Sequence, residues 1–423
     1  MTDLTQTKYL IVGCSHAGLA ATEAIRLADE TGSVAIVSRE TGPVYSPTIL
    51  PYVMSGEKGP GDIHLREPVD FEQLRVARLA GAAVKGVDAA RRTVLCESGR
   101  LIEYEKLLLA TGADATVPPF PGIESVPYLV VRTLEDAVQL RERARTAKSA
   151  IVIGAGLIAM HAAEKLAEAG LKVTVVVRRP VSLFAYFDAT AAGVIEAIFA
   201  DHGVRLATGS AVAQVAPAGG GCAVTLASGA RVTGDLLLLA AGVQPRIGFL
   251  EGTGVEVDQG ILVDTFMRTS VPGIWAAGDV AQAPGFFDPE RTVNATLPNA
   301  SVQGRIAGMD MAGDPVLKPY VGSGGWNTFN FFGNHAFSLG RAGATESADD
   351  IEVETLHQPG SRCYQKLVFE NDRLVGVSAI NVELDPGVLR ELIERRTDLG
   401  AVREAFGRDP LNTGRFLMTE LWR

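Results

Sequence analysis

The stretch that decides the fold is KYLIVGCSHAGLAA, residues Lys8–Ala21. An apolar run leads into a glycine turn and then into small residues at helical spacing, which predicts a strand, a phosphate-binding loop and a helix. Gly13 would make the turn, Gly18 would let the helix pack closely on the sheet, and the N–H groups of the helix N-terminus would face a pyrophosphate. Ser15 holds the middle position of the G-x-G-x-x-G pattern, a mild departure. Taken alone, the motif also fits an ordinary packing turn.

The composition limits the class of partner. The chain has 423 residues, of which 47% are hydrophobic and 21% charged, and its formal net charge is −10. This length favours two or three domains. The negative charge disfavours nucleic acid and anionic membrane surfaces as partners. No apolar run reaches the roughly 20 residues of a membrane span and no leader pattern opens the sequence, so a cytoplasmic protein without membrane contact is expected.

The cysteines restrict the redox chemistry. Four are present, and they lie far apart: Cys14, Cys96, Cys222 and Cys363. None belongs to a C-x-x-C pair or another cluster, so an iron–sulfur or zinc site built by this chain alone is excluded and no metal is expected. The sequence also lacks a closely spaced dithiol that would reduce a disulfide.

The opening pattern returns as SAIVIGAGLIAMHAAEKLAEAGLKVTVVV, residues 149–177. Gly154 and Gly156 fill the first two glycine positions and Ala159 fills the third, between a predicted strand and a predicted helix. The two loops lie too far apart for a short-period repeat, so we expect two dinucleotide-binding domains.

Other segments fit the same interpretation. Glu40 closely follows the predicted strand 33–38, where a carboxylate binds ribose hydroxyls or is simply exposed. A buried strand ends in Thr111–Gly112, and another ends in Gly278–Asp279, where the aspartate would bind ligand hydroxyls or cap a helix. A helix beginning at Pro298 carries small residues that allow close packing.

Two segments are of a different kind. Residues 43–57, PVYSPTILPYVMSGE, predict an irregular segment that either covers a ring system or is only a connection. Residues 364–377 predict a hairpin around Asn371 and Asp372, followed by amphipathic helices. We expect this C-terminal part to serve packing or partner binding.

Taken in order, these signals resemble the FAD-dependent pyridine nucleotide–disulfide oxidoreductase superfamily over nearly the whole chain. The resemblance implies an α/β fold with two nested Rossmann-like dinucleotide-binding domains and a small α+β C-terminal domain. The implied boundaries are 1–117 and 246–322 for the FAD-binding domain, 118–245 for the NAD(P)-binding domain and 323–423 for the C-terminal interface domain. The implied FAD-binding residues are Gly13, Ser15, His16, Ala17, Gly18, Glu40, Thr111, Gly112, Gly278 and Asp279. The implied NAD(P)-binding residues are Gly154, Gly156 and Ala159, and the charge of Arg178 and Arg179 adds these two residues as candidates.

Besides Ser15, the sequence departs from the family pattern at Thr48, at His161 and at Val177. Thr48 stands where thiol-using members carry a redox cysteine, so no redox-active disulfide or persulfide is expected. His161 stands where a helix glutamate near the nicotinamide is common, and it is either a packing residue or a proton carrier. The strand-end acid is replaced by Val177, with Arg178 and Arg179 after it, which favours the 2′-phosphate of NADP.

A narrower resemblance, to the flavin subunits of phenylglyoxylate dehydrogenases, is carried by YSPTILPYVMSGE, by MHAAE (160–164) and by MDMAGDP. It implies NAD, so the choice between NAD and NADP stays open. It also implies an electron-transfer subunit that passes electrons from iron–sulfur clusters through FAD to NAD(P), with iron–sulfur and thiamine diphosphate subunits as partners. The alternatives are a stand-alone NAD(P)H-dependent reductase of rubredoxin or ferredoxin, an NADH oxidase, or a non-catalytic FAD-binding assembly subunit.

Overall fold

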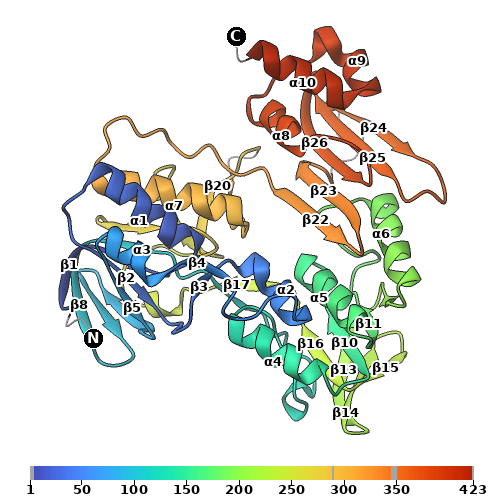
Figure 1. The fold of residues 1–423 in the computed structure, drawn as a ribbon, viewed down its shortest axis with the longest axis horizontal. Helices are drawn as coiled ribbons and strands as arrows, with labels where there is room; N and C mark the ends of the chain where they lie inside the picture. Colours follow the sequence, from blue (N-terminus) through green and yellow to red (C-terminus); the bar gives the residue numbers. More distant parts are fainter. Residues whose placement is uncertain (1–3, 288–289, 344–349, 422–423) are drawn as a thin grey trace. The chain divides into compact units, whose positions relative to one another are not determined.

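The computed structural model describes residues 4–287, 290–343 and 350–421. The chain divides into two compact units. Figure 1 labels the helices and strands of the chain. Unit 1 comprises Met1–Leu50, Lys58–Asp114 and Val243–Ser323, and unit 2 comprises Pro51–Glu57, Ala115–Gly242 and Gly324–Arg423. Both units are discontinuous in sequence, as nested domains require. The finer division into three domains stays a prediction.

Unit 1 is built on a seven-stranded sheet whose central strands are parallel. Its path is β5 (Val76–Ala80), β2 (Val34–Ser38), β1 (Gln6–Val12), β8 (Leu101–Leu109), β7 (Thr93–Cys96) and β6 (Val84–Asp88), with β19 (Ile274–Ala276) paired to β8. The apolar runs of β1 and β2 are buried almost throughout, as expected for parallel strands covered on both faces.

Helices α1 (His16–Ala28) and α7 (Leu297–Ala312) lie side by side in unit 1 (Figure 1). The small residues of α7 make this possible, because a Cβ at Gly308 would lie 2.4 Å from the carbonyl oxygen of Ala21. The remaining elements of unit 1 are short: β3 (Val44–Tyr45), η1 (Pro47–Ile49), β4 (His64–Arg66), α3 (Pro68–Gln73), η3 (Gly248–Leu250), β18 (Ile261–Leu262), β20 (Ala281–Pro284) and β21 (Arg291–Thr292). Strands β9 (Ala113–Ala115) and β17 (Val243–Pro245) pair where the chain passes between the units.

Unit 2 contains a second parallel sheet, in the order β12 (Arg205–Ala207), β11 (Lys172–Val176), β10 (Ser149–Ile153) and β16 (Leu236–Leu239). The strand order 12-11-10-16 is that of a Rossmann-like half, with β10 leading into helix α5 (Leu157–Glu168). An antiparallel sheet of β13 (Val212–Ala218), β14 (Gly221–Leu226) and β15 (Arg231–Gly234) accompanies it. The other elements here are α2 (Leu50–Ser55), which begins in unit 1, η2 (Ile123–Ser125), α4 (Leu134–Ala144) and α6 (Ala189–Asp201).

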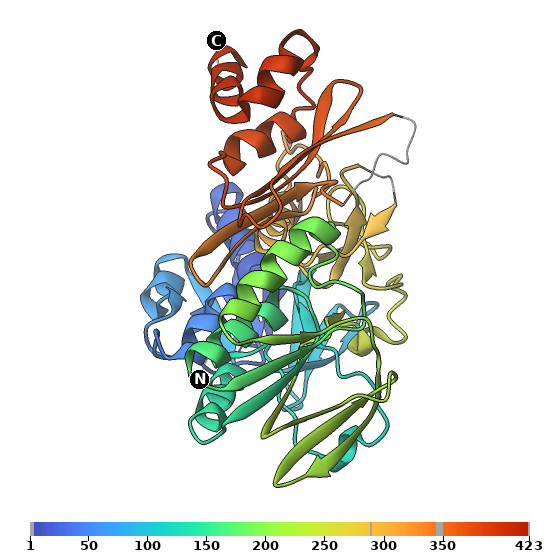
Figure 2. The same ribbon diagram turned by 90° about the vertical axis from the view of Figure 1, so that its right-hand side faces the viewer.

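The C-terminal part of unit 2 is a five-stranded antiparallel sheet. Its order is β22 (Trp326–Phe331), β23 (Asn334–Gly340), β26 (Arg373–Ile380), β25 (Tyr364–Glu370) and β24 (Ile351–His357). Figure 2 shows the C-terminal helices, in red, against this orange sheet; they are α8 (Pro386–Glu394), α9 (Arg403–Arg408) and α10 (Pro410–Leu421), preceded by η4 (Gly400–Val402). The hairpin predicted around Asn371 and Asp372 is confirmed, since both turn residues have positive φ, 51° and 56°.

Across the described ranges, no helix combines the length and the apolar character needed to cross a bilayer.

Candidate functional site: two dinucleotide-binding loops

The first loop, between β1 and α1, is made by two glycines that nothing larger can replace. Gly13 has a φ of +119°, and a Cβ there would lie 2.0 Å from the carbonyl oxygen of Ala110, at the end of β8. A Cβ at Gly18 would lie 2.0 Å from the carbonyl oxygen of Gly13. The loop therefore closes tightly on the sheet and on its own helix, as the sequence predicts.

The N-terminus of α1 is open to an anion. Ser15 is the N-cap residue, its hydroxyl makes no capping hydrogen bond, and the first turn contains no acidic residue. The first N–H groups of a helix have no partner within the helix and carry its positive dipole end. Gly278 reaches the same place from β19, because a Cβ there would lie 3.1 Å from the Cβ of Ala17. This arrangement suits a pyrophosphate.

The remaining predicted FAD residues lie at the ends of the unit 1 strands. Glu40 follows β2 and accepts a hydrogen bond of 2.7 Å from the Tyr45 hydroxyl. Thr111 follows β8, and its hydroxyl donates to the carbonyl oxygen of Arg246 over 3.2 Å. Asp279 is half-buried in the turn after β19. Their roles toward FAD stay predictions, but the fold brings their segments together in one unit.

Thr48 lies in a chain of polar groups that leads back to the loop. Its hydroxyl is 2.8 Å from the Ser46 hydroxyl, which is 2.8 Å from Nε2 of His16, the first residue of α1. Burial lowers the pKa of His16, while the nearby Asp279 carboxylate acts in the opposite direction. His16, Ser46 and Thr48 thus form a hydrogen-bonded chain of one imidazole and two hydroxyls, and the match of Thr48 to the redox cysteine of the family stays a prediction.

In the second loop, between β10 and α5, the two glycines have different surroundings. Gly154 has a φ of +134°, and a Cβ there would lie 2.1 Å from the carbonyl oxygen of Ala240, so the fold itself requires this glycine. A Cβ at Gly156, the N-cap residue of α5, would meet nothing within 4 Å. Because packing does not require Gly156, its missing side chain leaves room for a ligand at the helix N-terminus. Ala159, at the third position of the pattern, is fully buried.

The end of β11 has no acidic residue. Val177, next in the chain, is 2% exposed and points into the core, whereas Arg178 and Arg179 are exposed. The guanidinium of Arg179 lies 4.6 Å from the centroid of the Phe184 ring, an exposed aromatic side chain. Two cations and one exposed aromatic ring thus follow the end of β11, and their role in binding a ribose stays a prediction.

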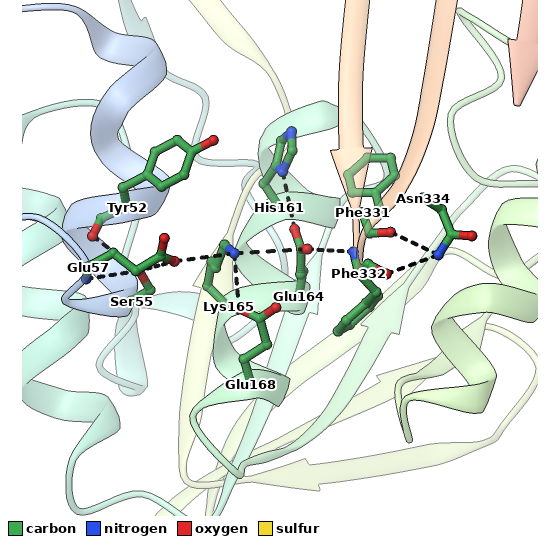
Figure 3. A network of polar contacts seen from close by, with 10 residues as sticks. All are labelled: Tyr52, Ser55, Glu57, His161, Glu164, Lys165, Glu168, Phe331, Phe332 and Asn334. Carbon is green, nitrogen blue, oxygen red and sulfur yellow. Dashed lines mark hydrogen bonds and ion pairs between the residues drawn. The ribbon is translucent and has the colours of Figure 1, made fainter. Parts of the chain in front are cut away.

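The predicted residue His161 lies on α5 beside a group that the sequence argument missed. Its Nδ1 is 3.4 Å from a carboxylate oxygen of Glu164, and its ring packs against that of Phe331 with centroids 4.8 Å apart. Glu164 is buried, and next to it Lys165 pairs with Glu168 and Glu57 (Figure 3). The i, i+3 spacing within MHAAE was the available signal for the His161–Glu164 pair.

All four cysteines lie in the described ranges and are unpaired. Burial raises the pKa of the Cys14 thiol, in the first loop, to about 11, so this group is a neutral thiol at neutral pH. No group of three or more His, Cys, Asp or Glu side chains is placed to hold a metal within the part of the chain that the structure describes.

Two Rossmann-like sheets, each with a glycine loop leading into an open helix N-terminus, define a class of proteins that bind two dinucleotides. Residues 7–304 match the family described as pyridine nucleotide-disulphide oxidoreductase, and the chain belongs to this family. The residues described above fit the FAD and the nicotinamide dinucleotide that the family implies.

The chain is 46% identical over 421 residues, which is 99% of both sequences, to a protein named NADH-dependent phenylglyoxylate dehydrogenase subunit epsilon from Aromatoleum evansii. Among solved structures it is similar to the water-forming NADH oxidase of Lactobacillus brevis, with a TM-score of 0.84 and 25% identity over 93% of this chain and 92% of that one. An engineered form of that oxidase, bound to NADPH, gives the same values. The resemblance inferred from the sequence is confirmed.

Proposed function

We propose that this chain is the FAD-containing electron-transfer subunit of a larger oxidoreductase, in which electrons from partner iron–sulfur clusters pass through FAD to NAD(P)⁺. The single observation that carries the proposal is the similarity over 99% of both chains to a protein named as a subunit of phenylglyoxylate dehydrogenase. Phenylglyoxylate oxidation, with thiamine diphosphate in another subunit, is the reaction that we propose for the complex.

The residues of unit 1 would hold FAD. The N-terminus of α1 would bind the pyrophosphate, Glu40 the ribose hydroxyls and Asp279 the ribityl hydroxyls. FAD, when bound, exchanges single electrons with one partner and a hydride with another. Thr48, Ser46 and His16 provide hydrogen-bonding groups but no thiol, so this chain would not store electrons in a disulfide.

The residues of unit 2 would hold the nicotinamide dinucleotide, with its pyrophosphate at Gly156. Two observations bear on the choice between NAD and NADP, and they favour different dinucleotides. The relative from A. evansii is named NADH-dependent. The engineered NADPH oxidase, in contrast, replaces an aspartate by alanine and the next residue, an alanine, by arginine. The resulting pair of an uncharged residue and an arginine is similar to Val177 and Arg178 here.

The test compares the purified chain with the chain co-expressed with candidate cluster-bearing subunits. Alone, the flavin-loaded chain should reduce ferricyanide with NADH or NADPH but should form no reduced dinucleotide from phenylglyoxylate. Co-purification with iron-containing subunits should restore that reaction. Activity of the isolated chain on phenylglyoxylate would refute the proposal.

A second candidate is a stand-alone NAD(P)H-dependent reductase or oxidase, which the similarity to the L. brevis NADH oxidase supports. Oxygen uptake by the isolated chain with NADH, or rapid reduction of added rubredoxin or ferredoxin, would favour it. An electron-transfer subunit should take up oxygen slowly, because its reduced flavin passes electrons to NAD(P)⁺ and not to oxygen.

A further inference from the structure

Glu164 is a buried carboxylate, with a relative exposure of 4%, on the face of α5 that meets the C-terminal sheet. The nearest cation, Nζ of Lys165, is 3.9 Å away. Placing a carboxylate in such a position costs free energy unless its oxygens accept hydrogen bonds. In Figure 3 the two oxygens of Glu164 face two different partners.

The first partner is the tip of the β22–β23 hairpin. One oxygen, Oε1, accepts a hydrogen bond of 2.6 Å from the backbone N–H of Phe332. Phe332 and Gly333 form the two-residue turn, with φ values of 48° and 74°. The side-chain amide of Asn334 donates to the Phe332 carbonyl oxygen over 3.0 Å. Glu164 therefore receives a donor whose position the turn fixes.

The second partner is His161. The other oxygen, Oε2, lies 3.4 Å from Nδ1 of His161. The Phe331 ring, on the strand that leads into the same turn, packs against the imidazole at a centroid distance of 4.8 Å. The imidazole is thus held both by a carboxylate and by an aromatic ring, and Figure 3 shows its second nitrogen on the side away from Glu164.

We propose that Glu164 is a positioning residue that keeps the proton of neutral His161 on Nδ1 and leaves Nε2 as a hydrogen-bond acceptor. An ionised carboxylate can only accept, so the ring nitrogen that faces it must donate. The value of this arrangement for catalysis rests on the proposed function, in which the position of His161 on α5 lies near the nicotinamide. The tautomer itself does not depend on that function.

A structural role for Glu164 can be separated from the positioning role because its two oxygens have different partners. In Glu164→Gln the amide oxygen would still accept from Phe332, since an NH₂ group there would face another donor. The NH₂ group would then face Nδ1 of His161 and donate to it. The proton of the imidazole must therefore move to Nε2, while the hairpin contact is kept.

The experiment measures the His161 tautomer in the full-length, FAD-loaded protein by ¹⁵N NMR at pH 8, with His161→Gln to assign the signals. We expect a protonated Nδ1 in the wild type and a protonated Nε2 in Glu164→Gln, with little change in Tm. Glu164→Ala, which loses both contacts, should lower Tm. Glu168→Gln is the matched control, because Glu168 lies one turn further along α5 and pairs with Lys165 over 3.0 Å. It should leave the tautomer unchanged.

A protonated Nε2 in the wild type, or an unchanged tautomer in Glu164→Gln, would overturn the proposal. Stopped-flow reduction of the flavin by NADH and NADPH then tests the link to the reaction. Glu164→Gln should slow this step by about fivefold or more, the effect of one lost or reversed hydrogen bond, with a smaller change in dinucleotide affinity. An inverted tautomer with an unchanged rate would refute the positioning role. If the wild type binds no dinucleotide, the proposed function fails while the tautomer result stands.

Discussion

Gly304 of α7 lies against Ala17 of α1 so closely that a Cβ at position 304 would be 2.1 Å from the Ala17 carbonyl oxygen. Ala17 belongs to the first turn of α1, which directly follows the first dinucleotide-binding loop. The packing of α7 on α1 therefore bears directly on the shape of that loop, although the two segments are far apart in sequence.

The first prediction follows from this contact. Gly304→Ala should lower the free energy of unfolding by about 1–3 kcal/mol, because the backbone of two helices would have to separate. Thermal and urea unfolding would measure the loss. Gly193→Ala is the control, since Gly193 is an exposed position of α6 where a Cβ meets nothing within 4 Å. That change should be neutral or stabilising by up to about 1 kcal/mol, through helix propensity. Equal effects of the two substitutions would contradict the packing argument.

The second prediction concerns the two glycines of the second loop. Gly156→Ala should leave Tm unchanged, because its Cβ has free space, but it should weaken dinucleotide binding about tenfold by occupying the place of the pyrophosphate. Gly154→Ala should instead lower Tm, because both its φ of +134° and the Ala240 carbonyl oxygen exclude a side chain. Calorimetric titration and thermal unfolding separate the two effects. A destabilised Gly156→Ala protein with intact binding would argue against a ligand at this helix N-terminus.

The third prediction addresses the choice of dinucleotide. If Arg178 and Arg179 bind a 2′-phosphate, Arg178→Glu with Arg179→Ala should weaken NADPH binding at least about tenfold, the value of one charge-assisted hydrogen bond. NADH binding should change much less. Dissociation constants for both dinucleotides, measured on the wild type and the variant, decide the matter. An unchanged NADPH/NADH ratio would show that these arginines are only solvated surface groups.

The fourth prediction concerns Asp279. Asp279→Ala should release FAD, because a carboxylate that accepts hydrogen bonds from ligand hydroxyls contributes roughly 1.5–3 kcal/mol to binding. The ratio of flavin to protein absorbance after gel filtration measures the loss. Glu105→Ala, on an exposed position of β8, is the charge-matched control and should keep its flavin. Full flavin occupancy in Asp279→Ala would remove this residue from the FAD site.

The fifth prediction is a pH dependence. The folded-state pKa of His16 is lowered by burial from the usual 6.5, so the unfolded chain binds the proton first as the pH falls. The stability from a neutral His16 is therefore complete above about pH 7.5 and is lost as the pH falls through 6.5 toward the lower folded value. Urea unfolding of the apoprotein between pH 8 and 5 should show a shallower decline for His16→Gln than for the wild type. Parallel curves would show that His16 titrates normally.

The sequence predicted the local structure correctly where steric limits allow a short segment only one backbone conformation. The turns at Gly13 and Gly154, the apolar strands before them and the hairpin at Asn371 all follow from short-range rules, and the structure has them. The family resemblance, carried by the order of the motifs, is also borne out by the comparison over residues 7–304.

Contacts between distant segments could not be predicted in this way. Periodicity places Glu164 on α5, but it does not show that the Phe332 turn supplies a hydrogen-bond donor to it. Likewise, the small residues of α7 predicted close packing without identifying α1 as the partner. The hydrogen bond between His16 and Ser46 also joins residues that only the fold brings together.

The empty surroundings of Gly156 also bear on how this family diverges. A subunit that has ceased to use a nicotinamide dinucleotide is free to accept any small side chain at this position without loss of folding, whereas the position of Gly154 remains constrained by the sheet. Relatives that keep the first of these glycines and vary the second are therefore the ones to examine for a lost dinucleotide. By this criterion the present chain, which has both Gly154 and Gly156, meets the requirement of the proposed nicotinamide dinucleotide site.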